Sequence, residues 1–394
     1  MADETIGAAW VLPVAAPPIR DGAVVVAGGR VAWVGRRADA PSLTRDLGPG
    51  VLLPGLVNAH CHLELSWLRG RLSGARGFVP WVEHLVEARA EEDLEALRAA
   101  ADEAIAEAVA CGTAAVGDVS NTLAHLDLLE ASSLHAVVFH ELLGWDPGVA
   151  DRVFASASAR RRAHAGAGGR VTVRLAAHAP HSVSPRLLRA LVEDGGPAAI
   201  HLAEAQAETD FLATGEGEWR GFLDRRGLGH VGGAPPATSP VRYLEALGAL
   251  HPGLLAAHAV RVDQGDRALL ARRGVSVVLC PRSNATLGVG LAPLPELLAD
   301  GVRVCLGTDS LASAPSLDLL QDAALLHRAY PQVPPRALVR AATAGGAEAL
   351  GLGDLGTLEP GRRAALAFAP APAEVADPER FLVSGEARCR RVDA

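Results

Sequence analysis

Short apolar runs recur along the middle of the chain, and each of them ends in polar residues. Eight of these runs lie between Gly55 and Ser310, at 55–62, 112–121, 134–141, 170–182, 198–204, 253–260, 274–284 and 301–310. Short apolar runs bounded by turn residues are typical of buried strands, and helical segments separate most of these runs. The pattern therefore predicts eight strands that alternate with helices.

The clearest helical segment covers residues 87–112. Its apolar side chains recur at helical spacing, at Leu94, Leu97, Ala101, Ile105 and Val109, and Gly112 follows as a C-terminal stop. Eight strand and helix units over about 300 residues predict an α/β fold, a (β/α)8 TIM-like barrel. A doubly wound sheet is the alternative, because both folds alternate strands and helices.

The two ends of the chain have a different pattern. Residues 22–35, "GAVVVAGGRVAWVG", contain two β-rich runs around a Gly-Gly turn and predict a hairpin. Short apolar pieces return in "GTLEPGRRAALAFAP" at 356–370. We therefore expect residues 1–53 plus 354–394 to form one small β-sandwich domain, and residues 54–353 to form the barrel.

Composition narrows the class of protein. A chain of 394 residues with 49% hydrophobic content can bury a large core. Its net charge of −8 has the wrong sign for binding the phosphate backbone of a nucleic acid. Five cysteines without a C-x-x-C indicate neither a disulfide framework nor a thiolate zinc site, and favour the cytoplasm. No apolar run reaches the roughly 20 residues of a membrane span. We expect a small-molecule substrate and no membrane partner. A homodimer is one option, because barrels of this size often pair.

The chain contains no lysine, because all of its basic residues other than histidine are arginine. This absence excludes a Walker-type phosphate loop, a Schiff-base enzyme and a carboxylated lysine that bridges two metal ions.

The polar residues that end the predicted strands are of few types. They are Asn58, His60, His62, His178, His201, Glu204, His258 and Asp309. In a barrel the loops at the carboxyl ends of the strands converge on one face, where active sites lie. His60 and His62, two apart on a strand, point to the same side and can hold one ion together, whereas Cys61 points away.

Five of these motifs, "NAHCH", "HLAE", "AHAV", "CPRSN" and "LGTDSLAS", occur in an order that resembles the amidohydrolase superfamily, in its cytosine/adenosine deaminase and chlorohydrolase branch. The resemblance implies that His60, His62, His201 and Asp309 bind a single divalent ion. Zn²⁺ is the first choice for this ligand set, and Fe²⁺ or Mn²⁺ accept the same set.

The resemblance also implies a metal-dependent hydrolytic deaminase that releases ammonia from an adenine-type ring, with Glu204, His258 and Asp309 as catalytic residues. A divalent ion lowers the pKa of a bound water toward roughly 7. Asp309 is then expected to receive the proton of the water, and Glu204 to protonate the ring nitrogen next to the attacked carbon. His258 is expected to stabilise the water or the developing charge.

The substrate is predicted from "NAHCHLELSWLRG" and Trp81, which are similar to sequences of aminodeoxyfutalosine deaminases, of a menaquinone pathway, and of methylthioadenosine/S-adenosylhomocysteine deaminases. Adenosine is a further candidate. The expected substrate contacts are His178, Trp81, Glu64 and Arg282. Glu64 could instead orient a ligand histidine. Arg282, with Arg69 as a second candidate, is suggested because a futalosine-type substrate carries a benzoate, which prefers a planar, bidentate cation.

Two further observations remain open at this stage. Residues 213–240 are rich in Gly and Pro, and we expect an irregular excursion that covers the site. The same ligands would also serve a hydrolase of another C–N or C–Cl bond on a heteroaromatic ring, such as a chlorohydrolase or a guanine or cytosine deaminase. A non-catalytic scaffold with this fold is the third possibility.

Overall fold

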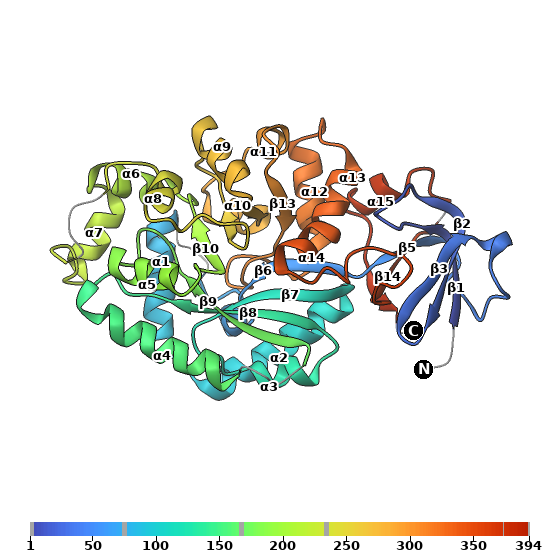
Figure 1. Cartoon of the computed structure of the whole chain (residues 1–394), viewed down its shortest axis with the longest axis horizontal. Coiled ribbons are helices and arrows are strands. Elements are labelled where there is room, and N and C mark those ends of the chain that lie inside the picture. The colour runs from blue at the N-terminus through green and yellow to red at the C-terminus, as the bar shows by residue number, and fades with distance from the viewer. Residues whose placement is uncertain (1–3, 73–76, 165–168, 232–235, 373, 393–394) are drawn as a thin grey trace.

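Strands from both ends of the chain form one sheet at one end of the molecule (Figure 1). The computed structural model describes the chain except residues 1–3, 73–76, 165–168, 232–235, 373 and 393–394. The sheet contains β1 (Glu4–Val11), β2 (Ile19–Ala27), β3 (Arg30–Arg36), β4 (Arg45–Asp46), β5 (Gly50–Pro54), β14 (Leu366–Pro370) and β15 (Arg390–Val392). Its order is β15-β14-β5-β1-β2-β3, and β4 pairs with β1. The hydrogen bonds thus define one seven-stranded sheet, and its packing as a sandwich stays a prediction.

The predicted hairpin is confirmed as the antiparallel pair of β2 and β3. Gly28 and Gly29 connect the strands with φ angles of 57° and 73°. Both angles lie in the left-handed region, which glycine adopts without the steric cost that a Cβ imposes.

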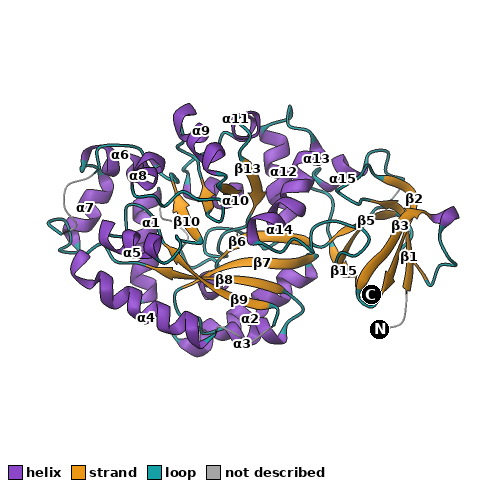
Figure 2. Cartoon of the chain, in the orientation of Figure 1, coloured by secondary structure: helices purple, strands orange, loops and turns teal. Residues whose placement is uncertain are grey.

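The eight predicted strands of the middle region are all present. They are β6 (Leu56–Cys61), β7 (Thr113–Ser120), β8 (His135–Leu142), β9 (Val171–Ala177), β10 (Ala199–Leu202), β11 (Leu255–His258), β12 (Ser276–Leu279) and β13 (Arg303–Leu306). They pair in parallel as two four-stranded sheets, β6-β7-β8-β9 and β10-β11-β12-β13. Helices lie around these strands (Figure 2).

Backbone hydrogen bonds connect the two parallel sheets at both of their edges. Between β9 and β10, the Ala198 N–H donates to the Leu175 carbonyl at 2.9 Å. On the other side, an isolated parallel bridge joins Cys61 at the end of β6 to Asp309 beyond β13. The carboxyl ends of β6, β10 and β13 consequently meet, and this brings together the polar residues that follow them.

The helices that accompany the strands are α1 (Phe78–Arg89), α2 (Leu94–Ala110), α3 (Leu126–Ala131), α4 (Ala150–Ala163), α5 (Pro185–Glu193), α6 (Gln206–Thr214), α7 (Glu218–Arg225), α8 (Pro240–Ala246), α9 (Gln264–Arg273), α10 (Pro281–Leu287), α11 (Leu294–Ala299), α12 (Leu319–Ala329), α13 (Pro335–Ala341), α14 (Ala344–Leu350) and α15 (Pro378–Leu382). Short 3-10 turns cover Arg37–Asp39, Leu63–Leu68 and Pro147–Val149. Within the described ranges, no helix combines the length and apolar character that crossing a bilayer requires.

The single helix predicted over 87–112 is in fact the end of α1 followed by α2. The Asp93 side chain accepts hydrogen bonds from the backbone N–H groups of Glu95 and Ala96, and so fixes the start of α2. Leu97 and Ile105 are buried as their spacing predicts, whereas 57% of Leu94 is exposed. A capping aspartate therefore divides a segment that hydrophobic spacing alone reads as continuous.

The segment 213–240 is less irregular than its composition predicts. It contains α7 and reaches the start of α8, while residues 232–235 lie outside the described residues. Figure 1 shows α6, α7 and α8 grouped with α1 at the end of the molecule opposite the terminal sheet. The glycines at 215 and 217 separate α6 from α7 with φ angles of 79° and 102°.

Candidate functional site

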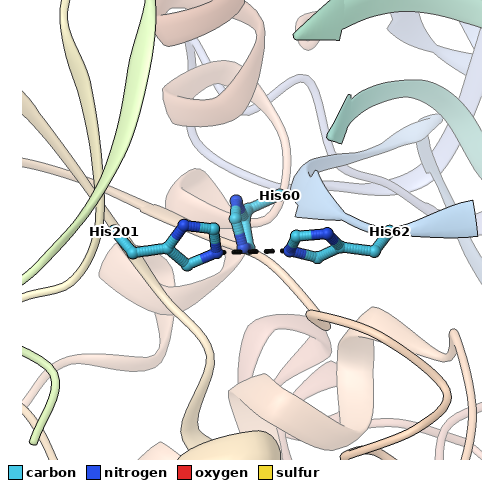
Figure 3. A group of neighbouring side chains, drawn as sticks. All are labelled: His60, His62 and His201. Carbon is cyan, nitrogen blue, oxygen red and sulfur yellow. Dashed lines mark hydrogen bonds between the residues drawn. The ribbon is translucent and has the colours of Figure 1, made fainter. Parts of the chain in front are cut away.

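Three histidine side chains converge where the parallel strands end (Figure 3). His60 lies on β6, His62 directly follows that strand, and His201 lies on β10. One nitrogen from each ring lies within 4.8 Å of the others. The Nε2 atoms of His62 and His201 are 3.2 Å apart. Both ring nitrogens of His60 are buried, with no hydrogen-bond partner in the described part of the chain.

This geometry fits a divalent ion. Two nitrogens that bind one tetrahedral Zn²⁺ at its usual bond length lie roughly 3.3 Å apart, close to the observed spacing of His62 and His201. An ion would also give one of the two unpaired ring nitrogens of His60 a partner, and a buried polar atom without a partner costs free energy of folding. Nδ1 of His201 faces the His178 carbonyl at 2.9 Å, which leaves Nε2 free to face the cluster.

Asp309 completes the cluster with one carboxylate oxygen. Its Oδ1 atom is 3.4 Å from Nε2 of His62 and 3.8 Å from Nε2 of His60. Its Oδ2 atom accepts hydrogen bonds from the hydroxyl groups of Ser283 at 2.5 Å and Ser313 at 3.2 Å. The two serines therefore orient the carboxylate, and Oδ1 remains available to an ion or a proton.

The backbone at Asp309 has an unusual conformation. Its φ angle is 59°, in the left-handed region that residues other than glycine seldom adopt. The backbone N–H groups of Thr308 and Asp309 both donate to the His60 carbonyl, at 3.1 and 3.0 Å. These contacts hold the residue in its strained conformation and couple its position to that of His60.

Charge further distinguishes the carboxyl groups at this site. Burial raises the pKa of Asp309, but the facing His62, His258 and His60 outweigh burial and lower it below its ordinary value. Glu204, which follows β10, has a pKa well above its ordinary value because of burial and the charges of Asp309 and Glu208. These surroundings thus favour the charged form of Asp309 and the protonated form of Glu204.

His258 ends β11 beside Glu204, with its Nδ1 atom 3.6 Å from a carboxyl oxygen of Glu204. Burial lowers the pKa of His258 to about 3, so the ring is neutral. The Asn284 amide nitrogen lies 3.0 Å from Nδ1, and an amide nitrogen can only donate. The ring proton of His258 is therefore on Nε2, which is buried without a partner among the described residues.

A cavity of about 340 Å³ opens over this cluster. His62, His201, Glu204, His258 and Asp309 line one part of it. His178 and Trp81, both predicted as substrate contacts, also line it. The buried Nε1 donor of Trp81 has no hydrogen-bond partner among the described residues. The cavity has the size and the mainly apolar lining of a small-molecule site.

Arg282 does not have the surroundings of a substrate contact, which corrects the sequence expectation. It is not among the described residues that line the cavity. Its guanidinium donates to the buried carboxylate of Asp322 at 2.9 Å, to the hydroxyl and carbonyl of Ser316 at 2.9 and 2.8 Å, and to the Asp318 carbonyl at 3.1 Å. These bonds occupy most of its donors. Arg282 therefore joins α10 to the start of α12.

Glu64 is also outside the lining of the cavity as the structure describes it. Its carboxylate accepts hydrogen bonds from the Ser120 hydroxyl, the Asn121 N–H, and the N–H and hydroxyl of Thr122, at 2.7 to 3.1 Å. Burial opposes ionisation, but these bonds lower the pKa of Glu64 below its ordinary value. Glu64 thus orders the loop after β7. Arg69, the second arginine candidate, pairs with Glu107.

Several cavity residues were not predicted from the sequence. They include Arg89, Asn121, Glu141, His181, Trp219 and Arg226. Glu141 ends β8 and could have been found, because it occupies the same strand-end position as the histidines. Trp219 and Arg226 come from α7 and the residue after it, and the expectation that segment 213–240 covers the site is the only sequence signal for them.

Comparison with known proteins gives this geometry a context. Residues 51–386 match the amidohydrolase family. A 5-methylthioadenosine/S-adenosylhomocysteine deaminase of Pelotomaculum thermopropionicum is 32% identical, over 93% of this chain and 84% of its own length. An aminodeoxyfutalosine deaminase of Deinococcus radiodurans is 34% identical, over 84% of this chain and 81% of its own length.

A solved structure agrees with these sequence matches. The structure of an adenosine deaminase from Xanthomonas campestris with bound zinc superposes with a TM-score of 0.81 at 26% identity. The match covers 98% of this chain and 89% of that one. From the family match and these relatives, we conclude that the chain belongs to the amidohydrolase family.

Proposed function

We propose that this protein is a metal-dependent hydrolytic deaminase that releases ammonia from the adenine-type ring of a nucleoside. The observation that carries the proposal is the cluster of His60, His62, His201 and Asp309 at one end of an apolar cavity. Beside it lies the carboxyl group of Glu204, whose pKa is raised by burial. The names of the two curated relatives support the choice of an adenine nucleoside.

One divalent ion, Zn²⁺ as first choice, would be held by His60, His62, His201 and Asp309. When bound, such an ion supplies a water of lowered pKa and so a nucleophile at neutral pH. The absence of lysine from the chain favours one ion over two, because no carboxylated lysine can bridge a pair.

The side chains of the site would carry the protons of the reaction. Glu204 donates its proton to the ring nitrogen beside the amino-bearing carbon, which makes that carbon electrophilic. A water attacks the carbon, and its first proton passes to Asp309. Nε2–H of His258 faces the same region and stabilises the attacking oxygen or its developing charge. These transfers give a tetrahedral carbon that carries both a hydroxyl and an amino group.

Collapse of the tetrahedral carbon returns both carboxyl groups to their starting states. The bond to the amino group breaks, and the leaving nitrogen takes the proton from Asp309 and departs as ammonia. The hydroxyl proton returns to Glu204 as the new carbonyl forms. The atoms balance as one water consumed and one ammonia released.

The proposal extends to the fold. We infer that the eight parallel strands close into a barrel, since hydrogen bonds join β9 to β10 and a bridge follows the ends of β6 and β13. We further propose a division into the barrel, residues 54–353, and a terminal domain of residues 1–53 plus 354–394.

The test is ammonia release by metal-quantified protein from adenosine, methylthioadenosine, S-adenosylhomocysteine and aminodeoxyfutalosine. We expect turnover of at least one of them, with loss of activity after chelation and recovery with Zn²⁺. Chloride or alkylamine release from a triazine, without ammonia from any nucleoside, would instead assign the protein to hydrolysis of other ring bonds. One bound metal without turnover of any of these compounds would indicate a scaffold.

A further inference from the structure

The cavity has aromatic walls on two helices that face each other. Phe78 and Trp81 come from α1, and Trp219 and Phe222 come from α7. The two helices are tied together by an ion pair between Arg225 and Glu83. Helix α7 therefore forms one wall of the cavity, and Arg226 directly follows it.

Arg226, directly after α7, lines the cavity and is exposed to solvent. Its guanidinium lies over the ring of Phe222, 4.9 Å from the ring centroid. No carboxylate among the described residues lies within ion-pair distance of it. An aromatic face attracts a guanidinium without neutralising it, so Arg226 keeps its charge available to a ligand.

The other arginines of this region differ in this respect. Arg225 lies one residue earlier and pairs with Glu83. Arg89 lines the cavity, but Glu92 at 3.4 Å and Glu64 at 3.8 Å offset its charge. Among the described residues that line the cavity, Arg226 thus combines a free positive charge with an exposed position.

Charge is distributed unevenly along the cavity. The carboxyl groups of Glu141, Glu204 and Asp309 belong to buried residues, whereas Leu143, 44% exposed, and Arg226 mark the opening. An anionic group of a ligand would be attracted to the guanidinium at the opening, because no neighbouring carboxylate that the structure describes neutralises the charge of Arg226.

We propose that Arg226 binds a carboxylate at the far end of the substrate, and that the preferred substrate is an adenine nucleoside whose ribose substituent ends in an aromatic carboxylate. This inference rests on the proposed deaminase function, because it assumes that the adenine ring occupies the buried end. The aromatic walls would then contact the arene, and Arg226 would bind its carboxylate with the planar, bidentate geometry that suits a guanidinium.

The test compares Arg226→Gln with the matched control Arg225→Gln on two substrates. Aminodeoxyfutalosine carries the carboxylate, and methylthioadenosine is neutral at the same end. We expect Arg226→Gln to lower kcat/KM for aminodeoxyfutalosine at least tenfold and for methylthioadenosine less than twofold. Arg225→Gln should change the ratio of the two values less than twofold. A loss that is equal for both substrates, or no loss, would overturn the assignment of Arg226.

Binding provides a readout that does not depend on turnover. Calorimetric titration with the deaminated product of each nucleoside should show that Arg226→Gln binds the product with the carboxylate more weakly than the wild-type protein does. Binding of the neutral product should not change. If the wild-type protein with bound metal deaminated neither nucleoside, the proposed function would fail. The titration would still support Arg226 as a carboxylate contact if the affinity fell, and would overturn it if the affinity did not change.

Discussion

Replacement of Glu204 by glutamine isolates the protonation step from metal binding. The two side chains have nearly the same size, and glutamine has no carboxyl proton to donate to a ring nitrogen. Glu204 lies outside the cluster of His60, His62 and His201, and its Oε1 atom is 3.6 Å from Nδ1 of His258. We therefore expect Glu204→Gln to keep its metal and to lose catalysis.

The expected size of the loss follows from the environment of Glu204. Glu204 is 5% exposed, and burial raises its pKa well above the ordinary value, which favours the protonated form that acts as the acid. General acid catalysis by a positioned group contributes about 10² to 10⁴ in rate, or roughly 3 to 5 kcal/mol. We expect kcat to fall by a factor in this range, with a smaller change in KM because glutamine preserves the shape of the cavity.

The assay is ammonia release at saturating nucleoside, with the metal content of each preparation measured in parallel. Glu204→Asp serves as the matched variant, because it keeps a carboxyl group but shortens its reach, and we expect intermediate activity. Full activity of Glu204→Gln at unchanged metal content would refute the proposed protonation step. Loss of metal together with activity would mean that Glu204 acts as a ligand.

Three further predictions concern the surroundings of the site. Asp309→Asn should lower both bound metal and ammonia release, the latter by at least about 10²-fold, because an amide cannot accept the proton; metal quantification would separate the two effects. Arg282→Met should leave Asp322 buried without its cation and lower the free energy of unfolding in urea by about 3 to 5 kcal/mol. A raised KM at unchanged stability would instead indicate that Arg282 contacts the substrate. Burial lowers the pKa of His125, but the adjacent Asp118 raises this pKa above 6.5 overall. The His125 contribution to stability is therefore complete below pH 6.5 and declines as the pH rises through the folded-state pKa. In urea unfolding from pH 5 to 9, His125→Gln should lack this decline, and equal pH profiles of the two proteins would contradict the prediction.

The strands and the convergence of the three histidines were predictable because their signals are local. Each strand is a short apolar run, and His60, His62 and His201 lie at or just beyond strand ends, where the fold itself brings side chains together. Family resemblance then selected these histidines from the 14 in the chain. The boundary between α1 and α2 was missed because hydrophobic spacing continues across it and a single capping residue decides it.

The remainder of the cavity was less predictable because its signals depend on tertiary contacts. Arg225 and Arg226 are adjacent and identical in type, yet one pairs with Glu83 across two helices and the other lines the cavity. No property of the sequence distinguishes them, since the difference arises from the direction in which α7 packs against α1. Glu64 was selected for its closeness to His62 in sequence, but its side chain turns toward the loop after β7.

The stretch from Arg282 to Asn284 shows why a matched motif indicates a neighbourhood more reliably than a role. Ser283 orients the Asp309 carboxylate, and Asn284 fixes the tautomer of His258. Arg282, between Cys280 and these two residues on the first turn of α10, turns away and anchors the helix through Asp322. Three consecutive residues thus contact Asp309, His258 and Asp322 in turn. Because α10 directs successive side chains about 100° apart, only residues on its inner face can reach the site, and the anchor on the other face determines where that inner face lies.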